Sequence, residues 1–135
     1  MSEYSDDTNT RHRAAFPGDP AGVRAMRVWL RGSLPDNCPH AADIQVCAAE
    51  LATNATRHTA SGGYLFAVTV ERDEVDIRLT VEDLGGDDAP EVTRSDASEL
   101  DASGHGLALV SALSDAWGSS GDAFGRDIWA VWALE

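Results

Sequence analysis

The sequence contains no lysine, so all ten of its basic residues are arginines. A Walker A phosphate-binding loop needs a lysine that reaches the nucleotide phosphates, and its absence excludes that motif. Cysteine is also scarce. The two cysteines, Cys38 and Cys47, fit neither a zinc-binding spacing nor a disulfide framework. We therefore expect a cytoplasmic protein with reduced thiols.

Long apolar runs are missing as well. No stretch approaches the roughly 20 apolar residues of a membrane-spanning helix. The first ten residues, MSEYSDDTNT, are polar and acidic, which is unlike a signal peptide or a membrane anchor. We predict a disordered tail over residues 1–10 and a single domain over residues 11–135, long enough to bury a core without disulfides or metal.

Charge is unevenly distributed in a chain whose formal net charge is −13. Residues 1–60 hold six arginines and seven acids, while residues 61–135 hold four arginines and sixteen acids, so the second segment carries −12. This excess argues against nucleic acid as a direct ligand, because neutralisation of phosphates dominates such binding. It is compatible with a basic protein partner or with a simple solvated acidic face.

The N-terminal part of the domain predicts a strand and a helix. Residues 11–16 form an edge-strand pattern that ends at Pro17. Asp19 and Pro20 then suit the N-cap and the first position of a helix that runs to about Gly32. The predicted apolar row of this helix is Val23, Met26, Val28 and Leu30.

A second helix is predicted from about His40 to Thr59, after a loop that contains Pro35 and Pro39. Its core-facing row has helical spacing. The row consists of Ile44, Cys47, Leu51 and Ala55. A hairpin follows, with strands over residues 64–71 and 75–83 and a turn at 72–74. In its second strand the apolar residues alternate with polar ones, and they are Val75, Ile77, Leu79 and Val81.

The last third of the chain starts with a long loop, predicted over residues 84–103. A helix then starts after Gly104 and runs to about Trp117, and DIWAVWAL at residues 127–134 is a final strand. Helices that flank a hairpin-rich sheet predict a two-layer α/β sandwich rather than a doubly wound fold.

Polar residues on the second helix mark a candidate site. Glu50, Asn54 and His58 are four residues apart, which places a carboxylate, an amide and an imidazole on one stripe. Two glycine-bearing segments follow, VEDLGG at residues 81–86 and SGHGLALV at residues 103–110. Each motif is weak alone, but their order and spacing are fairly specific.

These segments, together with GRDIWAV near the C-terminus, resemble the N box, the two glycine boxes and the terminal box of the GHKL ATPase superfamily. They are most similar to the small anti-sigma-factor serine kinases, and the resemblance covers the chain from about residue 11 to the end. It implies a Bergerat-type fold: a two-layer α/β sandwich with a mixed, mostly antiparallel sheet and helices on one face. It also implies ATP and Mg²⁺ as cofactors.

The resemblance assigns roles to residues of the helical stripe. Asn54 matches the asparagine whose side-chain oxygen coordinates Mg²⁺, an ion that prefers hard oxygen donors. Glu50 matches the general base, which takes a proton from a serine hydroxyl or water. Arg57 occupies the place of a basic residue near phosphate. His58 completes the stripe, and both contact with ATP and a packing or hydrogen-bonding role stay open for it.

Further nucleotide-binding residues follow from the glycine-bearing segments. Asp83 matches the aspartate that accepts a hydrogen bond from the adenine amino group, and Gly85 lets the backbone approach the base. Gly104, His105 and Gly106 open a helix whose N-terminus favours a polyphosphate. Arg94 and Leu107 are also expected to bind ATP.

Structural alternatives stay open for each of these motifs. Asn54 is compatible with a backbone hydrogen bond, Glu50 with solvation, the Asp83–Gly85 segment with a strand-ending turn, and Gly104–Gly106 with a plain helix start. The chain also departs from the family. His105 stands where arginine or lysine is usual, and Asp127 where a threonine near adenine is common.

The resemblance implies a regulator that phosphorylates serine on a STAS-type antagonist protein and alternately sequesters a sigma factor, commonly as a homodimer. Nucleic acid and membrane are not expected as direct partners. The alternative is a non-catalytic protein-interaction module whose ATP binding is weak or has been lost. A histidine-kinase catalytic fragment is disfavoured because the chain has no phosphoacceptor helix and no dimerisation hairpin.

Overall fold

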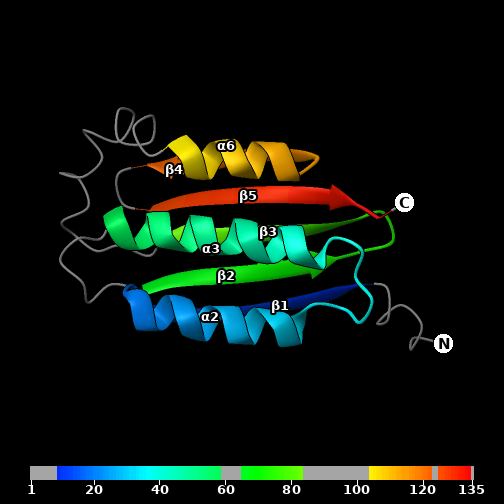
Figure 1. Cartoon of the computed structure of the whole chain (residues 1–135), viewed down its shortest axis with the longest axis horizontal. Helices are drawn as coiled ribbons and strands as arrows, with labels where there is room; N and C mark the ends of the chain where they lie inside the picture. The colour runs from blue at the N-terminus through cyan, green and yellow to red at the C-terminus, as the bar shows by residue number, and fades with distance from the viewer. Residues whose placement is uncertain (1–8, 59–64, 84–103, 123–124, 135) are drawn as a thin grey trace.

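Within the residues that the structure describes, the fold is a five-stranded sheet with three helices on one of its faces (Figure 1). The computed structural model describes residues 9–58, 65–83, 104–122 and 125–134. The strands are β1 (Thr10–Pro17), β2 (Leu65–Arg72), β3 (Asp76–Asp83), β4 (Ala116–Asp122) and β5 (Gly125–Ala133). The helices are α2 (Pro20–Ser33), α3 (Ala41–His58) and α6 (Gly104–Leu113). The predicted two-layer α/β sandwich is confirmed.

The sheet has the strand order β1-β2-β3-β5-β4. All four strand pairs among the described residues are antiparallel, so this part of the sheet is uniform rather than mixed. The helices α2, α3 and α6 follow one another across the sheet, with α2 beside β1 and α6 beside β4 (Figure 1). The chain therefore builds one helical layer, with α3 in its middle.

The core lies between the helices and the sheet, where period-2 and helical apolar patterns meet. Every residue of the predicted row on α3 is buried, from Ile44 at 0% exposure to Ala55 at 7%. Opposite them, the buried strand residues include Phe66, Val68, Val70, Ile77, Leu79, Val81, Ala130 and Trp132. The indole N–H of Trp132 donates to the carbonyl oxygen of Leu113 over 2.8 Å, which satisfies its polar atom and ties β5 to the end of α6.

Helix α2 begins as the sequence predicts. The Asp19 carboxylate accepts a hydrogen bond from the Gly22 N–H over 2.8 Å, and Pro20 occupies the start of the helix. Met26 and Leu30 are fully buried, but Val28 is 63% exposed, so its predicted place in the apolar row is wrong. Val28 follows Met26 by two residues, about 200° around a helix, and therefore points to the opposite side.

Two further predictions fail near turns. Val75 is 68% exposed and precedes β3, because the Asp73 carboxylate accepts hydrogen bonds from the Val75 and Asp76 N–H groups and forms the turn there. Trp117 lies in strand β4, which the sequence did not predict, rather than at the end of a helix. The helix ends at Leu113, and β4 pairs with β5 although glycine and serine give it little strand propensity.

Replacing either of two glycines in α2 with alanine is expected to change the stability of the protein in opposite directions. A β-carbon at Gly22 would overlap the carbonyl oxygen of Pro17, whereas one at Gly32 would meet nothing within 4 Å. We expect Gly22→Ala to destabilise the protein by about 2–4 kcal/mol, because the backbone must shift. Gly32→Ala should stabilise it by up to about 1 kcal/mol through helix propensity. Urea unfolding of both variants checks this, and equal stabilities would contradict the close approach of β1 and α2.

Candidate functional site

The three predicted motif segments converge at one end of the molecule. The C-terminal end of α3, the end of β3 and the start of α6 lie at the same end in Figure 1. Helix α3 packs against both α6 and β3, so these elements are neighbours in space as well as in the view. Segments separated by up to fifty residues in the sequence therefore surround one region.

Asn54 is the most unusual residue of this region. It is a buried polar side chain, 6% exposed, and its Nδ2 atom has no hydrogen-bond partner among the described residues. An unsatisfied buried amide costs about 1–3 kcal/mol, and such a group needs an explanation. The unpaired Nδ2 group is an N–H donor, so it fits a ligand acceptor such as a phosphate oxygen. The Oδ1 atom of the same amide is a hard oxygen donor of the kind that suits Mg²⁺. Because Mg²⁺ usually takes one or two protein oxygens together with phosphates, it does not need a cluster of carboxylates.

Glu50 lies one helical turn before Asn54 and is half-buried. Its carboxylate affects the pKa of Cys47, which lies on the core side of the same helix. The pKa of the buried Cys47 thiol is raised from 9.0 to about 11, chiefly by burial, with further contributions from the nearby carboxylates of Asp43 and Glu50. The carboxylate of Glu50 is thus close to the core yet retains access to solvent, as a residue that exchanges protons with a substrate requires.

The raised pKa of Cys47 predicts a loss of stability in alkali. The unfolded thiol ionises near pH 9 while the folded thiol keeps its proton to about pH 11. Stability is therefore retained below pH 9 and falls by about 2–3 kcal/mol as the pH rises through this window. Urea unfolding between pH 8 and 10.5 should show a shallower decline in Cys47→Ala than in wild type. Cys38→Ala, the matched control, should keep the wild-type slope, and identical slopes in all three proteins would contradict the assignment.

Asp83 is the last residue of β3 and is half-buried. Side chains alternate along a strand, and Leu79 and Val81 are buried under the helices. Asp83 therefore belongs to the helix-bearing face of the sheet, at the end where α3 also ends. Its cross-strand partners are Phe66 on β2 and Arg126 on β5. This position lies beside the C-terminal end of α3, and the adenine-binding role of Asp83 stays a prediction.

The structure corrects the expectation for Asp127. This residue pairs with Glu82, one position away from Asp83, and so belongs to the opposite face of the sheet. Burial and the neighbouring Glu82 raise the pKa of Asp127, and Arg13, which binds Glu82, opposes the shift. The position across from Asp83 belongs to Arg126. Period-2 alternation along the apolar residues Ile128, Ala130 and Trp132 is the sequence signal that assigns position 126, rather than 127, to the face of Asp83.

The remaining predicted residues are described in part. Helix α6 starts at Gly104 as predicted, and Leu107 is half-buried and packs against the core. The side chains of Arg57, His58 and His105 lie outside the described part of the structure, as do residues Gly85 and Arg94 altogether. In the described ranges, no helix combines the length and the apolarity that crossing a bilayer requires.

Comparisons with known proteins agree with this architecture. The sequence profile of the histidine kinase-like ATPase domain matches residues 16–132, and the chain therefore belongs to that family. Among curated proteins, none matches the sequence significantly.

Fifteen chains of solved structures match this chain, and two examples show the shared fold. The RsbU and RsbW domains of Rv1364c from Mycobacterium tuberculosis match with a TM-score of 0.63 and 20% identity, over 93% of this chain and 32% of that one. This chain thus spans about a third of that protein. The SiaB–SiaC complex from Pseudomonas aeruginosa matches with a TM-score of 0.64 and 18% identity, over 96% of this chain and 92% of that chain.

Proposed function

We propose that this protein binds Mg-ATP between α3, β3 and α6 and transfers the γ-phosphoryl group to a serine of a STAS-type antagonist protein. In the same proposal it is a cytoplasmic homodimer that alternately sequesters a sigma factor. The observation that supports the site most strongly is the buried Nδ2 group of Asn54, which has no hydrogen-bond partner among the described residues and lies one helical turn from Glu50. Membership of the histidine kinase-like ATPase family supports ATP as the nucleotide.

Each residue has a defined task in this mechanism. The Glu50 carboxylate accepts the proton of the serine hydroxyl, whose oxygen forms a bond to the γ-phosphorus while the bond to the β–γ bridging oxygen breaks. Asn54 would hold Mg²⁺ through Oδ1, and the ion would neutralise phosphate charge when bound. Asp83 would accept a hydrogen bond from the adenine amino group and select adenine over guanine.

The proposed partner rests on the structural neighbours. One neighbour contains RsbU and RsbW domains, and the other is solved as a complex of SiaB with SiaC. At 18–20% identity these structures share the fold, and their partners are a guide to the class of protein to test.

A non-catalytic module that binds nucleotide and acts only by holding a partner is the second candidate. It is favoured by His105, which stands where the family usually has a permanent positive charge, and by the net −12 of residues 61–135. These features weaken phosphate binding rather than the fold.

Incubation with γ-labelled ATP, Mg²⁺ and a STAS-type protein from the same organism tests the proposal. We expect labelled phosphoserine on the antagonist and none when its acceptor serine is replaced by alanine. Binding of both Mg-ATP and the antagonist without any transfer would contradict the kinase and support the non-catalytic module.

A further inference from the structure

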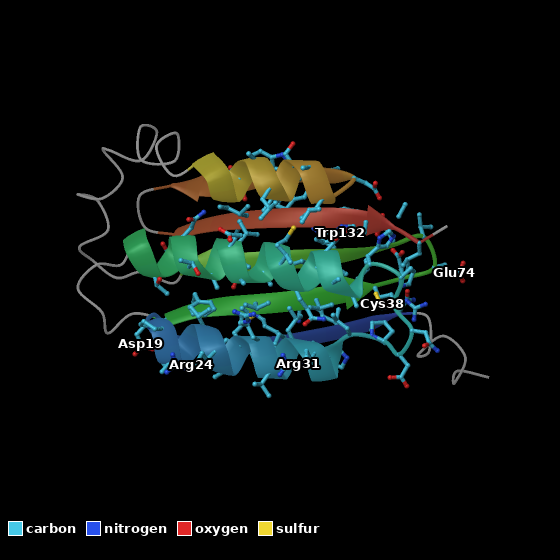
Figure 2. The ribbon with its side chains drawn as sticks, in the orientation of Figure 1. Asp19, Arg24, Arg31, Cys38, Glu74 and Trp132 are labelled. Carbon is cyan, nitrogen blue, oxygen red and sulfur yellow. The ribbon has the colours of Figure 1, made fainter. Side chains whose placement is uncertain are left out.

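The outer surface of α2 carries a group of three exposed arginines. Arg24, Arg27 and Arg31 are exposed, and none forms an ion pair with any residue that the structure describes. Figure 2 shows Arg24 and Arg31 on this helix, which lies at the edge of the helical layer. Unpaired positive charges concentrated on one helix are unexpected in a protein of net charge −13.

Three arginines of the described part of the sheet do have partners. Arg11 pairs with Glu71 at 3.4 Å, Arg13 pairs with Glu82, and Arg78 lies 4.7 Å from the ring centre of Trp129. All three lie on the face of the sheet away from the helices, because their neighbours in the strands point into the core. The three arginines of α2 differ from these three in location, because they lie on the helical layer rather than on the open face of the sheet.

An apolar seam runs beside these arginines. Val28 is 63% exposed, although it sits in the middle of a helix that buries Met26 and Leu30. Along the exposed side, Val28 falls into line with three small exposed residues at spacings of four, three and four, which is the spacing of a helix-pairing seam. These residues are Ala21, Ala25 and Gly32.

The geometry suits a second helix. Arg24 and Arg31 lie along one side of the seam, seven residues and about 10 Å apart on the axis, in a position that sets partner choice in paired helices. A β-carbon at Gly32 would meet nothing within 4 Å, so nothing in the described structure requires a glycine there. Glycine in a helix costs stability, and close approach of another backbone would explain its presence.

We propose that the exposed face of α2, defined by Arg24, Arg27, Val28, Arg31 and Gly32, is the docking surface for an acidic amphipathic helix of a partner protein. The apolar seam would bury against the partner's aliphatic residues, and the arginines would pair with its flanking carboxylates. We infer an acidic partner from charge complementarity, because the exposed arginines attract acidic groups and repel basic ones.

Two other occupants fit the surface less well. A second copy pairing through the same face would place its arginines against Arg24, Arg27 and Arg31, which is repulsive. Nucleic acid would leave the exposed Val28 unburied and would be repelled by the net charge of the protein. The proposal uses no residue of the nucleotide site, so it holds whether that site is catalytic or only binds nucleotide.

Fluorescence anisotropy with two synthetic peptides tests this proposal. Both probes are helices of about 21 residues, long enough to be helical alone, with leucine and alanine along one seam. One probe has glutamate and the other glutamine at the flanking positions. The protein variants are Arg24→Glu with Arg31→Glu and, as a control with the same change in charge, Arg11→Glu with Arg78→Glu.

We expect the wild type and the control variant to bind the glutamate peptide about tenfold more tightly than the glutamine peptide. The Arg24→Glu, Arg31→Glu variant should lose that preference while its circular dichroism and urea unfolding stay unchanged. Equal binding of the two peptides, or equal loss in the control variant, would overturn the proposal. The proposal would also be overturned if the wild type self-associates and only the α2 substitutions abolish that self-association. The occupant of the α2 face would then be a second copy of the protein.

Discussion

Replacing Glu50 with alanine is expected to lower phosphotransfer roughly 10²–10⁴-fold, the contribution of a positioned general base. ATP affinity should change by no more than about twofold, because a base acts on the serine proton and not on the nucleotide. The half-buried position of Glu50, one turn before Asn54 on α3, supports this separation of chemistry from binding. Single-turnover transfer to the antagonist and calorimetric titration with ATP measure the two quantities.

Asp43→Ala is a matched control for this experiment. Asp43 is a second half-buried carboxylate on α3, two turns before Glu50, and it also contributes to the raised pKa of Cys47. Its removal should leave phosphotransfer near the wild-type rate. Turnover that is the same in wild type and Glu50→Ala, or lowered equally by both substitutions, would show that the Glu50 carboxylate has a structural role only.

Replacing Asp83 with asparagine is expected to weaken ATP binding by about 1–3 kcal/mol and to reduce the preference for ATP over GTP. An amide presents a donor as well as an acceptor, so the purine amino group loses a charged partner. Asp83 lies at the end of β3 on the helix-bearing face, where the base is expected. Calorimetry with both nucleotides measures the change.

Glu82→Gln provides the control, because Glu82 is the adjacent carboxylate on the other face of the same strand. It should leave the affinity for both nucleotides unchanged while breaking the ion pair with Arg13. If Asp83→Asn and Glu82→Gln affect ATP equally, or if neither affects it, Asp83 does not select the base.

The parts of the fold with strong local signals were predictable from the sequence. The Asp19 cap and Pro20 located the start of α2, and helical spacing from Ile44 to Ala55 identified the buried side of α3. Strand β4 was missed because its residues have low strand propensity and are ordered by pairing with β5, a tertiary contact. Val28 was misplaced because an apolar residue was assigned to the core without regard to its angle around the helix.

In the candidate site, too, local sequence patterns predicted some features, while others depend on tertiary packing and strand register. The stripe of Glu50 and Asn54 follows from helical spacing, but the burial of Asn54 and its unsatisfied Nδ2 atom depend on how α3 packs. Asp127 was misassigned because strand register decides which face a residue occupies, and a slip of one residue reverses it. Only the pairing of β3 with β5 shows that Arg126, rather than Asp127, lies opposite Asp83.

Calorimetric titration of ATP in the presence and absence of Mg²⁺, on wild type and Asn54→Ala, tests the central claim most directly. Thr53→Ala is the control, since Thr53 is the exposed neighbour of Asn54 on the same helix. Wild type and Thr53→Ala are expected to bind ATP more tightly with Mg²⁺ than without it, and Asn54→Ala is expected to lose that difference. No binding of ATP at millimolar concentration, or the same Mg²⁺ dependence in all three proteins, would contradict the account.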